Sequence, residues 1–144
     1  MKMTTRILTT RFAVLLAVLV AMSQAVPVST WAGPADGQRD VVLSEPLQNV
    51  PGSQLTAVLV NYAPGAKSAK HHHAGSVFAY VLTGAIRSQN SATGPVRVYR
   101  AGESFFEPAG SVHLISENAS TTEPASLLAV FVAEAGAQRT NPDK

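Results

Sequence analysis

The chain contains no cysteine among its 144 residues. Disulfide bonds, thiolate catalysis and cysteine-based zinc sites are therefore excluded, and stability has to come from a buried core. Charged residues make up only 14% of the chain and aromatic residues 6%, whereas 46% of the residues are hydrophobic. This length and composition predict a single compact domain.

Most of the chain also lacks a surplus of basic charge. Lys and Arg together number 11, against 9 Asp and Glu, and three of the basic residues lie at the extreme N-terminus, at Lys2, Arg6 and Arg11. Without these three, no basic stripe remains to follow a phosphate backbone, and the sequence has no zinc-finger or helix-turn-helix pattern. We therefore expect no nucleic-acid partner.

One long apolar run, Phe12–Met22, follows the basic N-terminus. Its 11 residues are too few for a transmembrane helix, which needs about 20. Small residues follow at Ser23 and Ala25, the positions that a signal peptidase reads. We expect residues 1–25 to be a cleaved signal peptide, with an alternative cleavage after Ala32. The mature protein would then be periplasmic or secreted, with no membrane attachment.

The rest of the chain alternates short apolar segments with Gly- and Pro-containing turns, and it shows no long amphipathic helical pattern. Residues 26–39 are loop-like, and seven later segments have the composition of β-strands: Gln54–Tyr62, Val77–Leu82, Ala85–Ser88, Val96–Arg100, Ser104–Glu107, Val112–Ser116 and Ser126–Ala133. Turns spaced about 8–12 residues apart are typical of an all-β sandwich or barrel. We expect an N-terminal extension with the first strand or strands at 26–53, the folded domain at 54–134 and a flexible tail at 135–144.

All four histidines of the chain lie in two short stretches, at His71, His72, His73 and His113. Successive side chains of an extended strand point to opposite faces, so His71 and His73 share one face and His72 points the other way. On residue types alone two interpretations stay open. The histidines form a site, or the triplet is a solvated loop and His113 a hydrogen-bonded strand residue.

The spacing around these histidines resembles the two sequence motifs of the cupin superfamily. The first runs from Gly65 to Gly84, with five residues before the His-x-His pair and ten after it. The second runs from Gly102 to His113, with five residues before Pro-x-Gly and two after it. The resemblance covers roughly residues 55–131 and implies a jelly-roll barrel, the double-stranded β-helix, with a pocket at its mouth.

The resemblance implies that His71, His73 and His113 bind one divalent metal ion. Imidazole suits Fe, Mn, Zn, Cu and Ni in differing degree, so the metal stays undetermined. The family usually has a glutamate four residues after the second His of the first motif, where this chain has Val77. Three neutral imidazoles alone would leave the ion its full +2 charge and make it a stronger Lewis acid. Small cupins often dimerise, so a homodimer is also expected.

Glu107, directly before Pro108, is the one carboxylate that we can name as a catalytic candidate. Phe105 and Phe106 make both faces of its segment apolar, so the pattern does not determine where it points. We expect a solvated carboxylate at the rim of the barrel. Facing the barrel, it would instead act as a general base, as a fourth ligand or as a hydrogen-bond acceptor for a ligating histidine.

Alternation from His73 also predicts the lining of the pocket. Val77, Ala79 and Val81 fall on the inner face of their strand and would give a small apolar lining. Large aromatic residues nearby are expected in the core rather than in the pocket wall; these are Phe78, Tyr80 and Phe105.

Two functions are compatible with these features. The first is an exported, metal-dependent oxidoreductase of the dioxygenase type that acts on a small organic molecule. The second is a module that binds a metal or a small ligand without turnover, for storage or sensing. Retention of three imidazoles favours the first, and the missing carboxylate favours the second. The fold alone does not choose between them.

Overall fold

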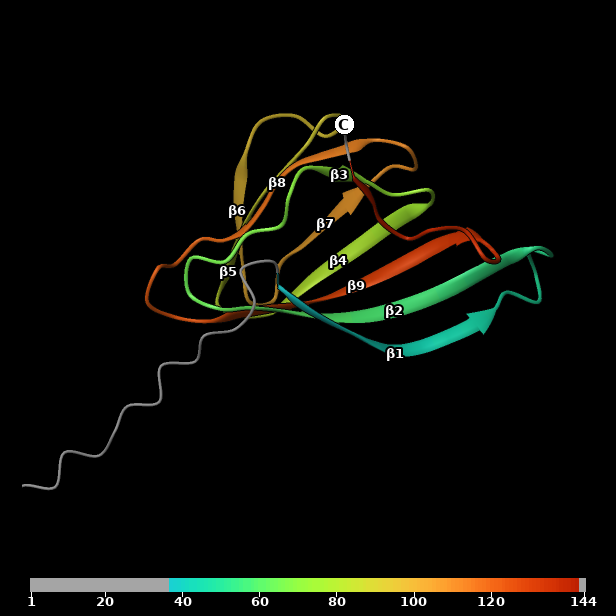
Figure 1. Cartoon of the computed structure of the whole chain (residues 1–144), viewed down its shortest axis with the longest axis horizontal. Coiled ribbons are helices and arrows are strands. Elements are labelled where there is room, and N and C mark those ends of the chain that lie inside the picture. The colour runs from blue at the N-terminus through green and yellow to red at the C-terminus, as the bar shows by residue number, and fades with distance from the viewer. Residues whose placement is uncertain (1–36, 143–144) are drawn as a thin grey trace, which may run out of the picture.

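The computed structural model describes residues 37–142, so the expected signal peptide, both cleavage sites and the segment before Gly37 lie outside the described residues. The described part consists of ten strands in two antiparallel five-stranded sheets, and it contains no helix (Figure 1). The predicted all-β double-stranded β-helix is therefore confirmed. Within residues 37–142, no helix is long and apolar enough to cross a membrane.

The first sheet holds the longer strands. In spatial order it contains β1 (Gln38–Pro46), β2 (Ser53–Tyr62), β9 (Ala125–Glu134), β4 (Ser76–Thr83) and β7 (Ser104–Glu107). Val58 and Val60 of β2 and Leu127 of β9 are buried at alternate positions, as a sheet with one covered face requires. This alternation fixes which face of the sheet meets the interior.

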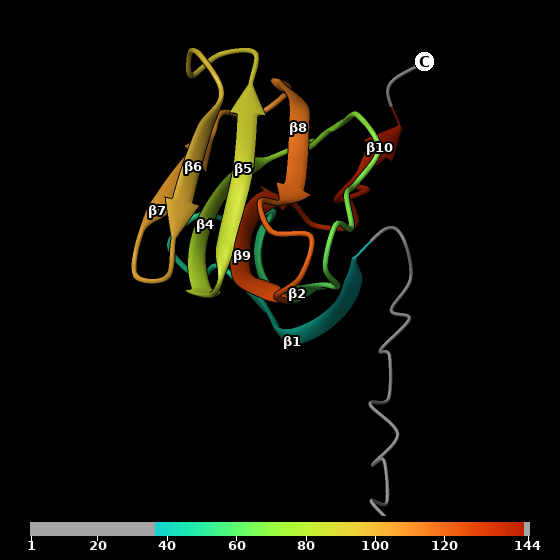
Figure 2. The same cartoon turned by 90° about the vertical axis from the view of Figure 1, so that its left-hand side faces the viewer.

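The second sheet has shorter strands. In spatial order it contains β10 (Asn141–Pro142), β3 (His71–His72), β8 (Val112–Asn118), β5 (Ala85–Asn90) and β6 (Arg97–Arg100). Figure 2 shows β6, β5 and β8 side by side in front of β4 and β9. The seven strands expected from sequence are all present, with their ends shifted by no more than two residues.

A short strand lies in the segment that was expected to be a flexible tail. Asn141 pairs with His72 and Pro142 with His71, so β10 forms an edge strand beside β3. The pairing satisfies backbone groups that a two-residue strand would otherwise expose. The tail thereby lies next to the histidine triplet.

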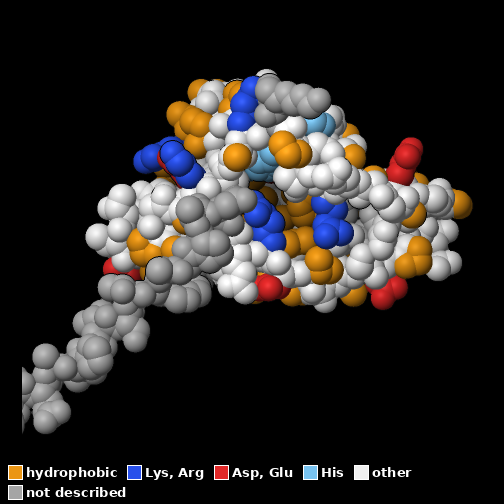
Figure 3. Space-filling model, viewed as in Figure 1, with side chains coloured by type: hydrophobic (Ala, Val, Ile, Leu, Met, Phe, Trp, Pro, Cys, Tyr) orange, Lys and Arg blue, Asp and Glu red, His pale blue; other side chains and the backbone are white. Residues whose placement is uncertain are grey.

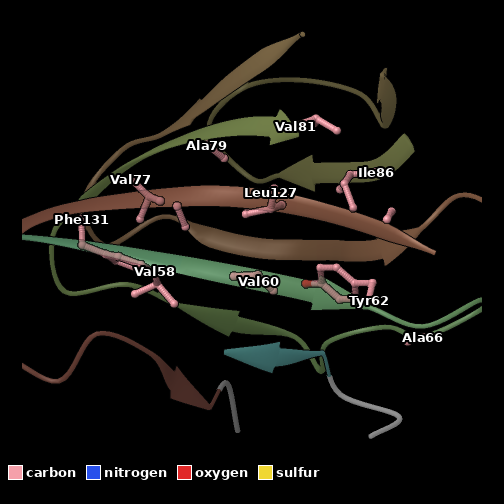
Figure 4. Close-up of a cluster of buried hydrophobic side chains, with 12 residues drawn as sticks. Val58, Val60, Tyr62, Ala66, Val77, Ala79, Val81, Ile86, Leu127 and Phe131 are labelled. Atoms are coloured by element: carbon pink, nitrogen blue, oxygen red, sulfur yellow. The ribbon is translucent and has the colours of Figure 1, made fainter. Parts of the chain in front are cut away.

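The core lies between the sheets, mainly against the first one (Figure 4). Val77, Ala79 and Val81 are almost completely buried, as predicted. Phe78 and Tyr80 are not in the core, contrary to the prediction, because pleat alternation places them on the outer face, where they are 44% and 39% exposed. Phe105 is half-buried and packs against the core, as expected.

Gly84 makes the tight link between the two sheets. It joins β4 to β5 with a φ of 68°, a conformation that favours glycine. A Cβ at this position would lie 2.6 Å from the carbonyl oxygen of Pro124. The glycine that closes the first motif is therefore required by the fold.

Candidate metal centre

The structure brings His71, His73 and His113 together. His71 on β3 pairs directly with His113 on β8, and His73 follows β3 immediately. One nitrogen of each ring lies within 4.8 Å of one nitrogen of the other two, and all three residues are buried. His72 is not part of this cluster and lies on the other side of the strand, as alternation predicted.

Backbone carbonyls fix the tautomers of two of these rings. His71 Nδ1 donates to Ala69 O, and His73 Nδ1 donates to Arg139 O, each over 2.6 Å. A carbonyl oxygen only accepts, so the proton sits on Nδ1 and the lone pair of Nε2 is left for another partner. Burial lowers the pKa of both imidazoles, which keeps them neutral. Neutral rings with a free nitrogen are the form that binds metal.

His113 is held differently. Its Nε2 lies 2.9 Å from Ser88 Oγ, and its Nδ1 lies 3.0 Å from Glu107 Oε2. Because a hydroxyl both donates and accepts, Ser88 is compatible with either tautomer of the ring. An ionised Glu107 carboxylate only accepts, so Nδ1 of His113 carries the proton in the metal-free site and Nε2 accepts from the Ser88 hydroxyl.

Glu107 is buried among the histidines, so the expectation of a solvated rim carboxylate is wrong. Only 3% of Glu107 is exposed, and its Oε2 lies 3.8 Å from His73 Nε2 as well as 3.0 Å from His113 Nδ1. The physical reason is the alternation of β7: Phe106 points outward and is 52% exposed, so Glu107 points inward.

The carboxylate of Glu107 lies beside the position at which the first motif lacks one. Glu107 on β7 pairs directly with Val77 on β4, the position that usually carries the glutamate in the resembling family. The acidic residue therefore lies on β7, at the position paired with Val77, rather than on β4. The sequence shows the loss at Val77, but only the strand pairing shows the replacement.

Glu107 is ionised in this setting. Burial raises the pKa of its carboxyl, but the hydrogen bond from His113, the proximity of His73 and the bond from Asn90 Nδ2 outweigh that effect. The pKa therefore lies below its ordinary value. The cluster thus combines three imidazoles with one negative oxygen.

This donor set fits a divalent transition-metal ion. Ligands about 2.1 Å from such an ion lie roughly 3.0–3.4 Å from one another. The 3.0 Å between Glu107 and His113 falls in this range, whereas the 3.8 Å to His73 and the imidazole separations of up to 4.8 Å exceed it, so these side chains would move closer together around one ion. Every ligating histidine also has a hydrogen-bonded second nitrogen, as metal-bound imidazoles usually do. With Glu107 as a ligand, the site's charge would be +1 rather than the +2 expected from imidazoles alone.

A cavity of about 300 Å³ adjoins the cluster. Val77 and Ala79 line it as predicted, whereas Val81 is buried in the core and is not part of its wall. Phe105, expected in the core rather than the wall, also lines the cavity. The volume is at the lower end of pockets that hold small organic molecules.

Sequence reasoning missed the residues that support the cluster. Ser88 and Asn90 are both buried on β5, at alternate positions after the core residue Ile86. Two polar residues on the inward face of a strand are a signal of a hydrogen-bonded site, and this signal was available in the sequence. The contribution of Arg139 O was not available, because it depends on the path of the tail.

Comparison with known proteins agrees with this fold. The model of the cupin domain family matches residues 58–131. An uncharacterized conserved protein with a double-stranded β-helix domain from Klebsiella pneumoniae is 26% identical, with a TM-score of 0.58 over 78% of this chain and 89% of that one. No curated protein sequence matches the chain.

Two further solved structures share the fold. KdgF from Halomonas sp. is 23% identical, with a TM-score of 0.56 over 73% of this chain and 84% of that one. Bacillus subtilis oxalate decarboxylase, a protein with Mn(II) centres, is 24% identical, with a TM-score of 0.55 over 71% of this chain and 27% of that one. Since the family model spans more than half of the 144 residues, the chain belongs to the cupin domain family.

Proposed function

We propose that this protein is an exported cupin that binds one divalent metal ion through His71, His73, His113 and Glu107. We further propose that it is a metal-dependent oxidoreductase of the dioxygenase type, acting on a small organic molecule in the adjoining cavity. One observation carries the proposal. Three imidazoles and an ionised carboxylate converge beside a cavity of about 300 Å³, and two of the imidazoles have their tautomers fixed.

The protein's own groups prepare this site before any ligand enters. The carbonyl oxygens of Ala69 and Arg139 orient two imidazoles, and Asn90 and His113 hold the Glu107 carboxylate. Val58, Val60 and Leu127 contribute apolar surface to the cavity wall. A bound metal would supply Lewis-acid polarisation of an oxygen donor and, for a redox-active ion, electron exchange with oxygen.

A binding function without turnover is the second candidate, and one observation favours it. Among the described residues that line the cavity, Glu107 is the only carboxylate, and it is already hydrogen-bonded to Asn90 and His113. If it serves as a ligand, no second acid–base pair lines the described part of the cavity. A protein for metal storage or ligand sensing needs no such pair.

Metal analysis followed by oxygen uptake separates these functions. The mature protein, purified without a histidine tag, is expected to carry about one Fe, Mn, Zn, Cu or Ni ion per chain by elemental mass spectrometry. Oxygen uptake is then measured with β-diketones, flavonols, catechols and thiols. Consumption of one class supports the oxidoreductase. Stoichiometric metal with no consumption supports the binding function, and failure to bind any of the five ions contradicts the oxidoreductase and metal storage.

The proposal of export rests on the N-terminal sequence. Basic residues, an apolar run and small residues precede the described part of the chain, in the order of a signal peptide. Expression of the full chain should yield a shortened protein in the periplasmic or culture fraction. Its N-terminal sequence should begin after Ala25 or Ala32, and an uncleaved chain in the cytoplasm would contradict export.

We also propose a homodimer through the first sheet. Every residue of its edge strand β1 is exposed, including Val41, Val42 and Leu43 at 47–57%. An exposed apolar edge strand is prone to pair with a second chain. Light scattering should give twice the chain mass, and Val42→Lys should shift it toward the monomer. A monomeric wild-type protein would contradict the dimer.

A further inference from the structure

The mouth of the cavity carries positive charge, whereas its only negative charge lies deep inside. Among the described residues that line the cavity, the permanently charged side chains are Arg39, Arg139 and Glu107. Both arginines are exposed, but Glu107 is only 3% exposed. Figure 3 shows Lys and Arg side chains on two sides of a hollow whose floor is hydrophobic. An entering molecule therefore meets the arginines before it reaches the histidines.

The two arginines come from opposite ends of the described chain. Arg39 lies on β1, where its Nη2 donates to Ser68 Oγ over 2.9 Å. Arg139 lies in the tail just before β10, and its carbonyl oxygen accepts the hydrogen bond from His73 Nδ1. The guanidinium of Arg139 makes no ion pair within residues 37–142. The fold thus brings two cationic groups to one opening.

A chain of hydroxyl groups continues inward from Arg39. Ser68 Oγ lies 2.9 Å from Tyr62 Oη, which in turn lies 2.9 Å from Ser116 Oγ. These three residues line one side of the cavity, and Val58, Val60 and Leu127 provide apolar surface. The interior therefore suits a ligand with an apolar body that also carries oxygen.

We propose that the cavity takes a small organic anion, whose charged group is held at the mouth by Arg39 and Arg139 and whose other end reaches the histidine cluster. Guanidinium groups bind carboxylates and phosphates through parallel N–H donors, and they stay charged at all physiological pH values. The proposal deepens the proposed function by naming the substrate class. It depends on that function only for the contact with the metal, since the arginines belong to the protein itself.

The test uses ligands of similar size that differ in charge. Binding of 4-hydroxybenzoate, 4-hydroxyphenyl phosphate and the neutral 4-hydroxybenzamide is measured by calorimetry on the mature protein. At least one of the two anions is expected to bind about tenfold or more tightly than the amide, and the stronger anion identifies the preferred group. Equal binding of all three, or no saturable binding of either anion, would overturn the proposal.

Substitutions then locate the origin of the charge preference. Arg139→Gln keeps the backbone carbonyl that orients His73, and it is expected to weaken anion binding about tenfold while changing amide binding less than twofold. Arg139→Lys should restore most of the loss. Arg97→Gln is the matched control, because Arg97 lies on β6 over the ring of Tyr99 and does not line the cavity. An equal loss for anion and amide in Arg139→Gln would contradict the assignment.

The same measurements on chelator-treated protein separate this proposal from the proposed function. The preference for the anion should persist without metal, because the arginines remain. If the protein binds no metal but keeps the preference, only the metal-dependent function fails. If it binds metal and consumes oxygen but does not distinguish anion from amide, only the present inference fails.

Discussion

The two sheets of this barrel face the same interior with different chemistry. The inner face of the first sheet is apolar along β2, β4 and β9, with Val60, Val81 and Leu127 as examples. The inner face of the second sheet carries buried polar groups along β3, β5 and β8; these are His71, Ser88, Asn90, His113, Ser116 and Asn118. One sheet therefore builds the core, and the other builds the site.

The difference shows how a small barrel can bury polar groups without losing stability. Within the described residues, no buried side-chain nitrogen or oxygen lacks a hydrogen-bond partner. Burial of an unpaired polar group costs about 1–3 kcal/mol. Because all of these groups are paired, the second sheet avoids this loss of stability. Thr56 on β2 and Glu107 on β7 are buried polar residues of the first sheet, and Glu107 reaches the histidine cluster.

Loss of His113 from the second sheet should lower metal affinity more than any other change. We expect His113→Ala to lower metal affinity by more than about 100-fold, because it removes a ligand and the main partner of Glu107. His72→Ala is the control, since His72 lies outside the cluster. Metal content and competition with a fluorescent chelator measure both variants. Equal losses in the two variants would contradict the assignment of faces along β3.

Moving the carboxylate from position 107 to the paired position 77 tests the role of Glu107. We expect Glu107→Gln to lower metal affinity about 10–100-fold, because a neutral amide replaces the charged oxygen. Val77→Glu alone places a second carboxylate opposite the first and should destabilise the metal-free protein through repulsion. The double variant Val77→Glu with Glu107→Gln should recover most of the lost affinity.

The outcome of the carboxylate exchange separates two roles of Glu107. Recovery in the double variant means that the carboxylate acts near the ion and can be supplied from either strand. If Glu107→Gln retains wild-type metal affinity, Glu107 is not a ligand. Metal titrations followed by calorimetry, with folding monitored by circular dichroism, give the readout.

A substitution in the first sheet should affect stability and leave the site intact. Val81 is fully buried in the core but does not line the cavity. We expect Val81→Ala to reduce the free energy of unfolding of the metal-free protein by about 2 kcal/mol, from lost burial and a small cavity. Metal affinity should change less than twofold. A large loss of metal affinity would show that packing in the first sheet also determines the geometry of the site.

Removal of the tail should have the smallest effect. Ending the chain after Ala137 removes the carbonyl of Arg139 that orients His73, together with β10. We expect metal affinity to fall about fivefold, because His73 keeps its place beside β3 but loses its fixed tautomer. Ending the chain after Pro142 is the control. Unchanged affinity after the longer deletion would mean that water replaces the carbonyl without cost.

Several features of the site followed from local pattern. The His71-x-His73 spacing placed two imidazoles on one face because side chains of a strand alternate, and alternation also placed Val77 and Ala79 inward. The same rule, applied to Ser88 and Asn90, would have revealed the supporting polar groups. For Glu107 the rule could not be applied, because the two preceding positions of its strand, Phe105 and Phe106, are both apolar.

The sequence by itself determined the all-β class, seven of the ten strands in residues 37–142 and the three histidines, because these depend on turn residues and on a two-residue period. The tertiary structure decided what depends on which strands become neighbours. Glu107 opposite Val77, the carbonyl of Arg139 beside His73, and the two arginines at one opening join residues that are far apart along the chain. No local pattern encodes these contacts, because the register between strands and the path of the tail are set by packing of the whole barrel.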